Sequence, residues 1–442
     1  MTIRMDEGAA ELLDTLHRAG YAAYVVGGCV RDSLLGLTPH DWDLCTSALP
    51  QQGMELFGAE KCIPTGLQHG TVTVKQGGGL YEITTFRTEG AYTDGRHPDE
   101  VHFVPDVRED LARRDFTINA MAYNAKEGLI DPFGGQADLQ SGILRAVGVP
   151  RQRFTEDALR ILRLYRFAAR FGFAIDPPTA QAAQELCAHL DCVSVERIEE
   201  ELAKLLSAPA PAAYLDEKIL GVVLPELSPE ALAAAKPVVD ACPAGERALP
   251  VRLAALLLSL GEDGTRRTLR RLRCSNACIE ETAVLVREVV SGVPGAFSSD
   301  TNRAIPSPAL LPAATGSHPS GRSSERLPAR PPVSLNIYTR KLLGQYGLKT
   351  VQRLAALGTA LQPEHAADFA ALSELAEQLD ADGVCCRVSQ LAVNGRDLMA
   401  AGVPAGPGIR KVLEALLDGV IREEYPNERQ TLLAAVQQLA AS

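Results

Sequence analysis

No apolar run in the chain reaches the roughly 20 residues that a membrane-spanning helix needs. The opening residues, MTIRMDE, also lack the basic and apolar regions of a secretory signal peptide. The net charge of −11 argues against a uniformly basic protein that coats RNA, although it leaves room for RNA binding by local arginine clusters. We therefore expect a cytoplasmic protein that has no membrane partner.

The 10 cysteines lack the spacing of a metal site or of a disulfide framework. Cys274 and Cys278 have no second pair that would complete a zinc site, and Cys385 and Cys386 are simply adjacent. We expect the thiols to be reduced and mostly buried. The length of 442 residues is enough for about three domains.

The most informative stretch is YVVGGCVRDSLLGLTPHDWDLCT, residues 24–46. Its apolar start predicts a buried strand, after which Gly27 and Gly28 let backbone N–H groups approach a phosphate closely. A short helix closed by glycine follows. In a strand, Asp41 and Asp43 would point to the same side and suit Mg²⁺, which one or two carboxylates and substrate phosphates usually hold. Alone, the glycines predict a turn and the aspartates a solvated loop, but together they indicate a site for a metal-bound triphosphate.

This stretch resembles the signature of nucleotidyltransferases with a DNA polymerase β-type head. It is most similar to the class II CCA-adding enzymes, which are bacterial tRNA nucleotidyltransferases, and bacterial poly(A) polymerases share much of it. The resemblance implies that Asp41 and Asp43 are catalytic and hold Mg²⁺. It also implies that Gly28 and Arg31 contact the triphosphate of the nucleotide. It covers nearly the whole chain apart from residues 292–333, whose Pro, Ser and Gly content predicts a disordered insertion.

Two further strands are predicted at residues 71–74 and 81–86, around the glycines at 77–79. In the second strand, Glu82 is either an ordinary outward polar residue or a third active-site carboxylate, and the resemblance implies the catalytic role. The polar stretch 87–104 predicts a flexible loop. In the resembled enzymes, such a loop helps the change from C addition to A addition.

The second motif is RRDFTINA, residues 113–120. An arginine can hold phosphate or ribose oxygens, and an aspartate can accept a hydrogen bond from a 2′-OH. Such charged triplets are also common on plain surfaces, but the whole motif matches the family's second motif. The resemblance implies that Arg114 and Asp115 bind the nucleotide and select ribose over deoxyribose. We expect residues 116–122 to begin a helix.

The third motif contains a row of charged residues that recur every three positions: Asp157, Arg160, Arg163 and Arg166. A helix would present them on one face. From the spacing alone, this face is either a solvated row of salt bridges or a binding surface. The family motif EDxxRxxR, which starts here at Glu156, favours a nucleotide-binding role for these residues.

Asp157 and Arg160 also have the right chemistry to choose between bases. Cytosine and adenine each present an amine donor beside a ring-nitrogen acceptor, whereas uracil and guanine present a carbonyl beside a ring N–H. An aspartate that accepts from the amine and an arginine that donates to the ring nitrogen would therefore admit only C and A. The resembled family uses the matching pair in this way.

The predicted fold class is α+β, with a polymerase-β-type head of mixed sheet and helices followed by an all-α neck, body and tail. We expect the head at residues 1–145, the neck with the base-reading helix at 146–205 and the body at 206–291. A tRNA-binding tail would then occupy residues 334–442. An arginine cluster at 266–273 predicts a phosphate-binding surface in the body.

The sequence therefore predicts a Mg²⁺-dependent enzyme that adds C, C and A to the 3′ end of tRNA from CTP and ATP and releases pyrophosphate. The alternatives on the same scaffold are a poly(A) polymerase and an enzyme that adds only CC or only A. The partial-adding enzymes would differ chiefly in residues 87–104. A tRNA-binding protein without catalysis is disfavoured, because such a protein has no use for clustered carboxylates that face phosphate. The sequence does not predict the oligomeric state.

Overall fold

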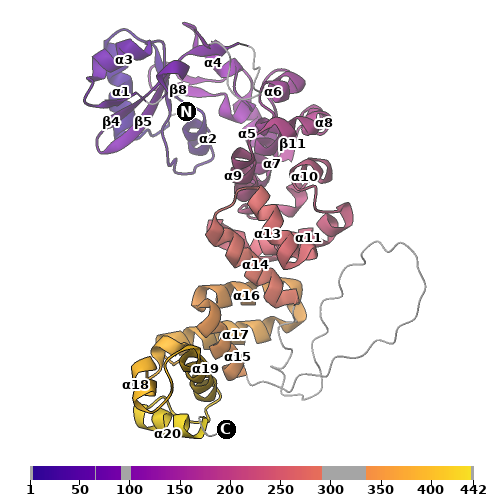
Figure 1. Ribbon diagram of the computed structural model, residues 1–442. Helices are drawn as coiled ribbons and strands as arrows, with labels where there is room; N and C mark the ends of the chain where they lie inside the picture. Colours follow the sequence, from indigo (N-terminus) through magenta and orange to yellow (C-terminus); the bar gives the residue numbers. More distant parts are fainter. Residues whose placement is uncertain (1–2, 65, 91–100, 291–334, 440–442) are drawn as a thin grey trace, which may run out of the picture. The chain divides into compact units, whose positions relative to one another are not determined.

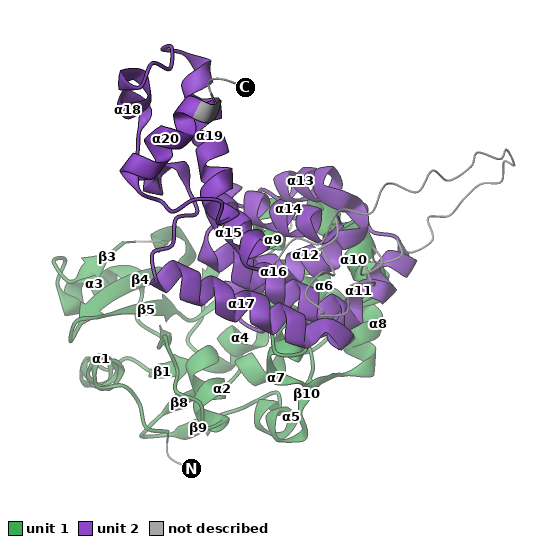
Figure 2. Cartoon of the chain, turned by 90° about the horizontal axis from the view of Figure 1, so that it is seen from below, with its two compact units in different colours: residues 1–225 green, residues 226–442 purple. Residues whose placement is uncertain are grey.

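The computed structural model describes residues 3–64, 66–90, 101–290 and 335–439. The chain divides into two compact units, residues 1–225 and 226–442 (Figure 2). The predicted insertion at 292–333 and the central part of the predicted loop at 87–104 lie outside the described residues. No described helix is long and apolar enough to cross a membrane.

Unit 1 contains a seven-stranded mixed sheet in the order β3-β4-β5-β2-β1-β8-β9, of which Figure 1 labels β4, β5 and β8. β2 and β5 run parallel, and the other neighbours in this sheet are antiparallel. The predicted strands near residues 24, 71 and 81 are confirmed. The strands are β1 Ala23–Val26, β2 Leu44–Thr46, β3 Cys62–Ile63, β4 Thr71–Gln76, β5 Gly79–Thr85, β8 Ala122–Asn124 and β9 Gly128–Ile130.

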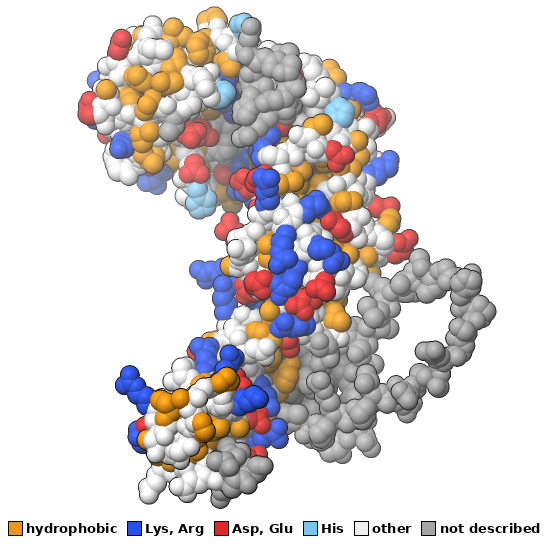
Figure 3. Space-filling view, in the orientation of Figure 1, with side chains coloured by type: hydrophobic (Ala, Val, Ile, Leu, Met, Phe, Trp, Pro, Cys, Tyr) orange, Lys and Arg blue, Asp and Glu red, His pale blue; other side chains and the backbone are white. Residues whose placement is uncertain are grey.

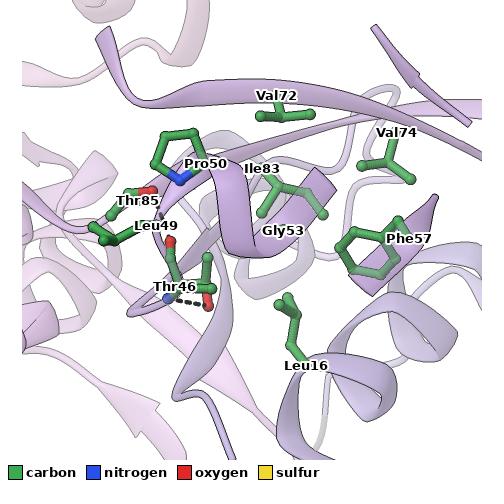
Figure 4. Close-up of a pocket in the computed structure, with 11 residues that line it drawn as sticks. Leu16, Thr46, Leu49, Pro50, Gly53, Phe57, Val72, Val74, Ile83 and Thr85 are labelled. Atoms are coloured by element: carbon green, nitrogen blue, oxygen red, sulfur yellow. Dashed lines mark hydrogen bonds between the residues drawn. The ribbon is translucent and has the colours of Figure 1, made fainter. Parts of the chain in front are cut away.

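One face of this sheet packs against α1 (Glu7–Arg18) and α3 (Pro50–Phe57). Leu16 and Phe57 from the helices meet Ile83 of β5 around a small apolar pocket beneath α3 (Figure 4). Because successive side chains alternate between faces, Glu82 points away from this pocket to the opposite face of the sheet. The pocket is thus part of the hydrophobic packing of unit 1.

The opposite face is partly covered by α4 (Val107–Ala112). Asp43 and Glu82 belong to this face by alternation, next to the covered part. Cys45, two residues after Asp43 and therefore on the same face, belongs to the hydrophobic core on this side of the sheet. The buried residues of this core are Tyr24, Val26, Cys45, Phe86, Val107, Leu111, Ala120, Ala122 and Val147.

The segment after the sheet is mostly helical, and α7 packs along α9. A short parallel pairing of β10 (Ile143–Leu144) with β11 (Ala174–Ile175) joins this helical segment to the end of the head. The helices of this segment are α5 Gly135–Ser141, α6 Pro150–Glu156, α7 Leu159–Phe171, α8 Pro177–Leu186, α9 Val195–Leu206 and α10 Glu217–Val223.

Unit 2 is helical throughout the residues that the structure describes. The prediction of a mixed-sheet head followed by helices is therefore confirmed. The helices of unit 2 are α11 Pro229–Ala241, α12 Leu249–Leu257, α13 Gly261–Arg271, α14 Asn276–Val290, α15 Leu335–Tyr346, α16 Leu348–Leu361, α17 Ala366–Ala381, α18 Gly395–Ala400, α19 Pro407–Ile421 and α20 Arg429–Leu439.

Two local predictions are wrong. Residues 116–122 do not begin a helix, but form a short 3₁₀ turn at Thr117–Asn119 that leads into β8. An apolar run that is buried on all sides carries no helical period, and here pairing with β1 and β9 determines the conformation. The stretch 87–104 is not loop throughout either, since β6 (Arg87–Glu89) and β7 (Val101–Phe103) pair antiparallel at its ends.

Candidate active site

Asp43 and Glu82 lie side by side on neighbouring strands. Leu44 of β2 is opposite Ile83 of β5, and the two strands are parallel. The residues that precede them, Asp43 and Glu82, are therefore also opposite each other. The Asp43 carbonyl accepts a hydrogen bond from the Val26 N–H at 2.9 Å, which extends the β1–β2 pairing by one residue. Both acidic residues are exposed on the open part of the sheet face.

Asp41 lies in the extended segment that leads into β2, which itself begins only at Leu44. Asp41 and Asp43 are exposed, whereas Trp42 between them is 9% exposed. This alternation places the two carboxylates on the same side of the chain, as the spacing in the sequence predicted.

The electrostatics of Asp43 show how close these acids are. Although Asp43 reaches solvent, the surrounding protein atoms desolvate its carboxyl group and raise its pKa, the negative charges of Glu82 and Asp41 raise it further, and Arg114 opposes the shift. A carboxyl group whose pKa is raised by neighbouring negative charges lacks enough positive charge nearby. A divalent cation would supply that charge.

These donors fit a hard divalent cation that is only partly coordinated by protein. Among the described residues, no three or more His, Cys, Asp and Glu side chains are gathered closely enough to hold a metal ion by themselves. Mg²⁺ usually keeps several waters and is held by one or two carboxylates together with substrate phosphates. Asp41, Asp43 and Glu82 match this incomplete kind of site.

Gly27 and Arg114 meet next to the carboxylates, on the β1 side. Gly27 joins β1 to α2 (Gly28–Leu34) with a φ of +75°, a conformation that favours glycine. A Cβ on Gly27 would lie 2.9 Å from Nη1 of Arg114. Arg114 donates to Asp110 at 3.4 Å, but its buried Nε has no hydrogen-bond partner. The guanidinium of Arg114 thus lies against the glycine turn and keeps one donor, Nε, that no described protein group accepts.

Arg31 has a different environment, because it is only 4% exposed. Its guanidinium donates to Asp32 at 2.7 Å and to Asn119 at 2.6 Å, and it lies over the rings of Phe167 and Phe171 in α7. Burial lowers the pKa of Arg31, against the effect of Asp32. Arg31 therefore connects α2 to α7, and its contact with a triphosphate stays a prediction.

Asp115 is buried and forms an ion pair with Arg163, whose side chain is 34% exposed. Both Nε and Nη2 of Arg163 donate to Oδ2 of Asp115, at 2.9 and 2.6 Å. Asn119 donates to Oδ1 at 3.0 Å. Burial alone would raise the pKa of Asp115, but Arg163 and Asn119 lower it to about 2. Two of the predicted nucleotide-binding residues are thus brought together and hold each other.

Arg166 is held by Glu201 of α9 and lies over the Phe167 ring, 3.8 Å from its centroid. Glu201 is also 3.8 Å from Arg163. The two arginines on α7 therefore share one carboxylate. This buried network joins α7 to α9 and to the residues that precede β8.

Asp157 does not lie on one helix face with Arg160, so that prediction is wrong. α6 ends at Glu156, and Asp157 has an extended backbone with φ of −142°. Its Oδ1 accepts from the Leu159 N–H at 3.0 Å, so Asp157 lies before α7 and binds the N–H of its first residue. Aspartate favours such positions because its side chain competes for backbone N–H groups.

The protein groups that bind Asp157 and Arg160 were not predicted from the sequence. Arg197 of α9 donates to Oδ2 of Asp157 at 2.8 Å, and Arg160 donates to Glu156 at 2.8 Å and to the Arg113 carbonyl at 3.1 Å. Glu156 belongs to the EDxxRxxR motif, which could have indicated its role. No sequence signal distinguishes Arg197 from an ordinary surface arginine.

Three family models match the chain. They are described as the poly A polymerase head domain at residues 23–145, a probable RNA- and SrmB-binding site of polymerase A at 172–230, and a putative tRNA nucleotidyltransferase domain 2 at 336–436. A CCA-adding enzyme of Lactiplantibacillus plantarum is 36% identical over 99% of this chain and 97% of its own length. This chain belongs to the family of CCA-adding enzymes. Another member, from Geobacillus thermodenitrificans, is 34% identical over 96% of this chain and 95% of its own length.

Solved structures of the family have the same fold. A crystal structure of the Bacillus stearothermophilus CCA-adding enzyme in complex with CTP has a TM-score of 0.78 at 30% identity, and the match covers 99% of this chain and 98% of that one. A Thermotoga maritima CCA-adding enzyme complexed with tRNA has a TM-score of 0.62 at 20% identity and covers 98% and 94%, which shows the fold. The polymerase-β-type head and the helical remainder are confirmed. Enzymes of this family are nucleotidyltransferases that use a divalent metal ion.

Proposed function

We propose that this protein adds C, C and A to the 3′ end of tRNA, using CTP and ATP, in the cytoplasm. The observation that carries the proposal is the level placement of Asp43 and Glu82 on β2 and β5, with Asp41 beside them. Gly27 and the unpartnered Nε of Arg114 adjoin these acids. Carboxylates next to a glycine turn and a free arginine donor suit a metal-bound triphosphate.

The metal ion is proposed to be Mg²⁺, held by Asp41 and Asp43 with Glu82 assisting. When bound, such an ion activates the attacking hydroxyl and stabilises the leaving oxygen of an in-line displacement. Gly27, Gly28 and Arg114 orient the β- and γ-phosphates. The O3′ of the tRNA then bonds to the α-phosphorus, the bond between the α-phosphorus and the bridging oxygen breaks, and the hydroxyl proton and pyrophosphate are released.

The base is selected by Asp157 and Arg160 at the start of α7. Asp157 accepts from the exocyclic amine of C or A, and Arg160 donates to the ring nitrogen. U or G would instead place a carbonyl against Asp157 and a ring N–H against Arg160, and each polar group of the base that is left unpaired costs about 1–3 kcal/mol. Asp115 and Arg114 bind the ribose and phosphate side of the nucleotide. Arg163 and Arg166 support these two residues from α7.

The domain division is also proposed, with a head at 1–145, a neck at 146–205, a body at 206–291 and a tail at 334–442. Arginines gather on α13 of the body, where Figure 3 shows a group of Lys and Arg side chains. Arg267 and Arg270 are exposed there and have no ion pair among the described residues. We assign this surface to tRNA phosphates, whose binding falls with added salt.

One assay tests the function. The protein is incubated with Mg²⁺, CTP, ATP and tRNAs that end before CCA, after CC or in complete CCA, and the 3′ ends are sequenced. We expect completion of the first two and no extension of the third. Long A tails would instead indicate a poly(A) polymerase, and a halt after CC would indicate a partial-adding enzyme. No extension of any tRNA would contradict the proposal.

A further inference from the structure

The open face of the head sheet carries two lysines beside the carboxylates. Thr73 of β4 is opposite Glu82 of β5, and Lys75 is two residues along β4 from Thr73. Lys75 therefore shares the face of Glu82 and lies about 7 Å further along the strand. The N–H of Lys75 donates to the Lys61 carbonyl at 2.9 Å, just outside β3, so Lys61 is its cross-strand neighbour on the same face.

Neither lysine is neutralised by the protein. Both are exposed, and neither has an ion pair in the described part of the chain. The carboxylate of Glu60, next to Lys61, lies against Gly58. Like charges that are directly opposite on a sheet are destabilising. Two unpaired ammonium groups at this place suit an anionic ligand.

The order of the strands indicates which anion this is. The sheet runs β3-β4-β5-β2-β1-β8-β9, with Glu82 on β5 and Asp43 directly before β2. Figure 2 labels β3, β4 and β5 on one side of the site and β1 and β8 on the other. Gly27 and Arg114 lie on the β1 side, where we place the leaving pyrophosphate. Lys61 and Lys75 lie on the opposite side, at β3 and β4. In phosphoryl transfer, the attacking and leaving oxygens are in line on opposite sides of the phosphorus.

We propose that Lys61 and Lys75 bind backbone phosphates of the RNA strand whose 3′-OH attacks the nucleotide. The inference rests on the proposed function, because it takes the pyrophosphate side from the predicted triphosphate site. Leu80, opposite Lys75 on β5, is 64% exposed and offers an apolar contact for a ribose or base of the same strand. The lysines position the RNA and take no part in the chemical step.

The test compares Lys61→Gln/Lys75→Gln with Lys126→Gln. Lys126 is exposed in the β8–β9 turn at the other edge of the sheet, so it is a matched control. With tRNA ending in CC, we expect the double variant to raise KM for tRNA roughly tenfold, while KM for ATP and kcat stay within about twofold. The dependence of log KM on log salt concentration should weaken by about 0.7 for each lost phosphate contact. Lys75→Arg in a Lys61→Arg background should preserve both values.

Two results would overturn the inference. One is a KM for tRNA equal to that of the Lys126 control, and the other is a rise in KM for ATP instead, which would place the lysines at the nucleotide. If the parent protein did not extend tRNA at all, the proposed function would fail separately. The lysines would then be tested by the binding of a fluorescent single-stranded RNA, and equal Kd values for the parent and the double variant would refute their role.

Discussion

The carboxylate of Asp157 accepts a hydrogen bond at 2.8 Å from Arg197 of α9. Arg160, three residues further along the chain, is held by Glu156 and by the carbonyl of Arg113. The two candidate base-reading residues are therefore fixed by separate partners. Each can be released by its own substitution, without a change in the other.

Replacement of the base-reading residues should change which nucleotides are used. We expect Asp157→Ala to lose discrimination against UTP and GTP, because the carbonyl of a wrong base no longer lies against a carboxylate. Arg160→Ala should do the same and also weaken the use of CTP. At about 1–3 kcal/mol for an unpaired group, the change in relative incorporation is roughly fivefold to 150-fold. Incorporation of all four nucleotides is measured for each variant, and an unchanged preference would place base selection elsewhere.

Arg197 should act as a positioning residue for Asp157. We expect Arg197→Ala to reduce discrimination between CTP and UTP roughly fivefold, which corresponds to about 1 kcal/mol or one typical hydrogen bond, and to leave KM for tRNA unchanged. Arg197→Lys should recover part of the discrimination. Arg151→Ala is the control, because Arg151 makes an exposed ion pair with Glu185 in the same unit. Equal losses in the Arg197 and Arg151 variants would indicate a merely structural effect.

The carboxylates on β2 and β5 should be needed for chemistry and not for RNA binding. We expect Asp43→Asn to lower kcat by about a thousandfold or more, since a bound metal contributes several kcal/mol. Glu82→Gln should have a smaller effect, and Kd for tRNA should change little in both variants. Chelation of metal should stop the reaction, and Mg²⁺ should restore it. Asp14→Asn, at an exposed position of α1, is the control, and near-normal turnover by Asp43→Asn would refute the metal site.

The ion pair of Asp115 and Arg163 should make unit 1 sensitive to acid. The folded-state pKa of Asp115, about 2, is below the ordinary value of 3.8, so the ionised form stabilises the fold. This contribution is complete above about pH 4 and is lost as the pH falls through about 2, and it amounts to roughly 2 kcal/mol.

The fluorescence of Trp42, the single tryptophan of the chain, reports unfolding of unit 1. The difference in unfolding free energy between the parent and Asp115→Asn should shrink by about 2 kcal/mol between about pH 5 and about pH 2. A difference that does not depend on pH would contradict the shift in the pKa of Asp115.

A glycine in α3 should be replaceable with a gain in stability. A Cβ on Gly53 meets no other atom within 4 Å, and a helical Gly→Ala change stabilises by about 1 kcal/mol. In the matched variant Gly8→Ala in α1, the new Cβ would collide with the ring and hydroxyl of Tyr81. Urea unfolding followed by Trp42 should therefore show opposite signs for the two substitutions, and equal signs would refute this account.

Local patterns predicted those parts of the site that depend on nearby sequence. The alternation of Asp41, Trp42 and Asp43 follows directly from strand geometry, and the glycine turn after β1 follows from its residue types. The break between α6 and α7 at Asp157 did not follow from the spacing, because a three-residue period does not reveal an aspartate that captures a backbone N–H.

Long-range partners had no counterpart in the sequence pattern. Arg197 is 40 residues from Asp157, and Asn119 is 88 residues from Arg31. The choice of hydrogen-bond partner for each arginine depends on how α9 packs against α7 and on where β8 joins the sheet. The lysines at positions 61 and 75 became neighbours only through the register of β3 and β4. Such pairings require the tertiary structure.

The ion pair between Asp115 and Arg163 also has a consequence for synthesis on the ribosome. A nascent chain that ends at residue 145 contains every strand of the seven-stranded sheet, yet it lacks the arginine that neutralises Asp115 and the phenylalanines that cover Arg31. Those partners come from α7, so the contacts that join Asp115 and Arg31 to the rest of unit 1 form only once α7 has been translated. Arg166 of α7 gains its carboxylate partner later still, when α9 with Glu201 has followed.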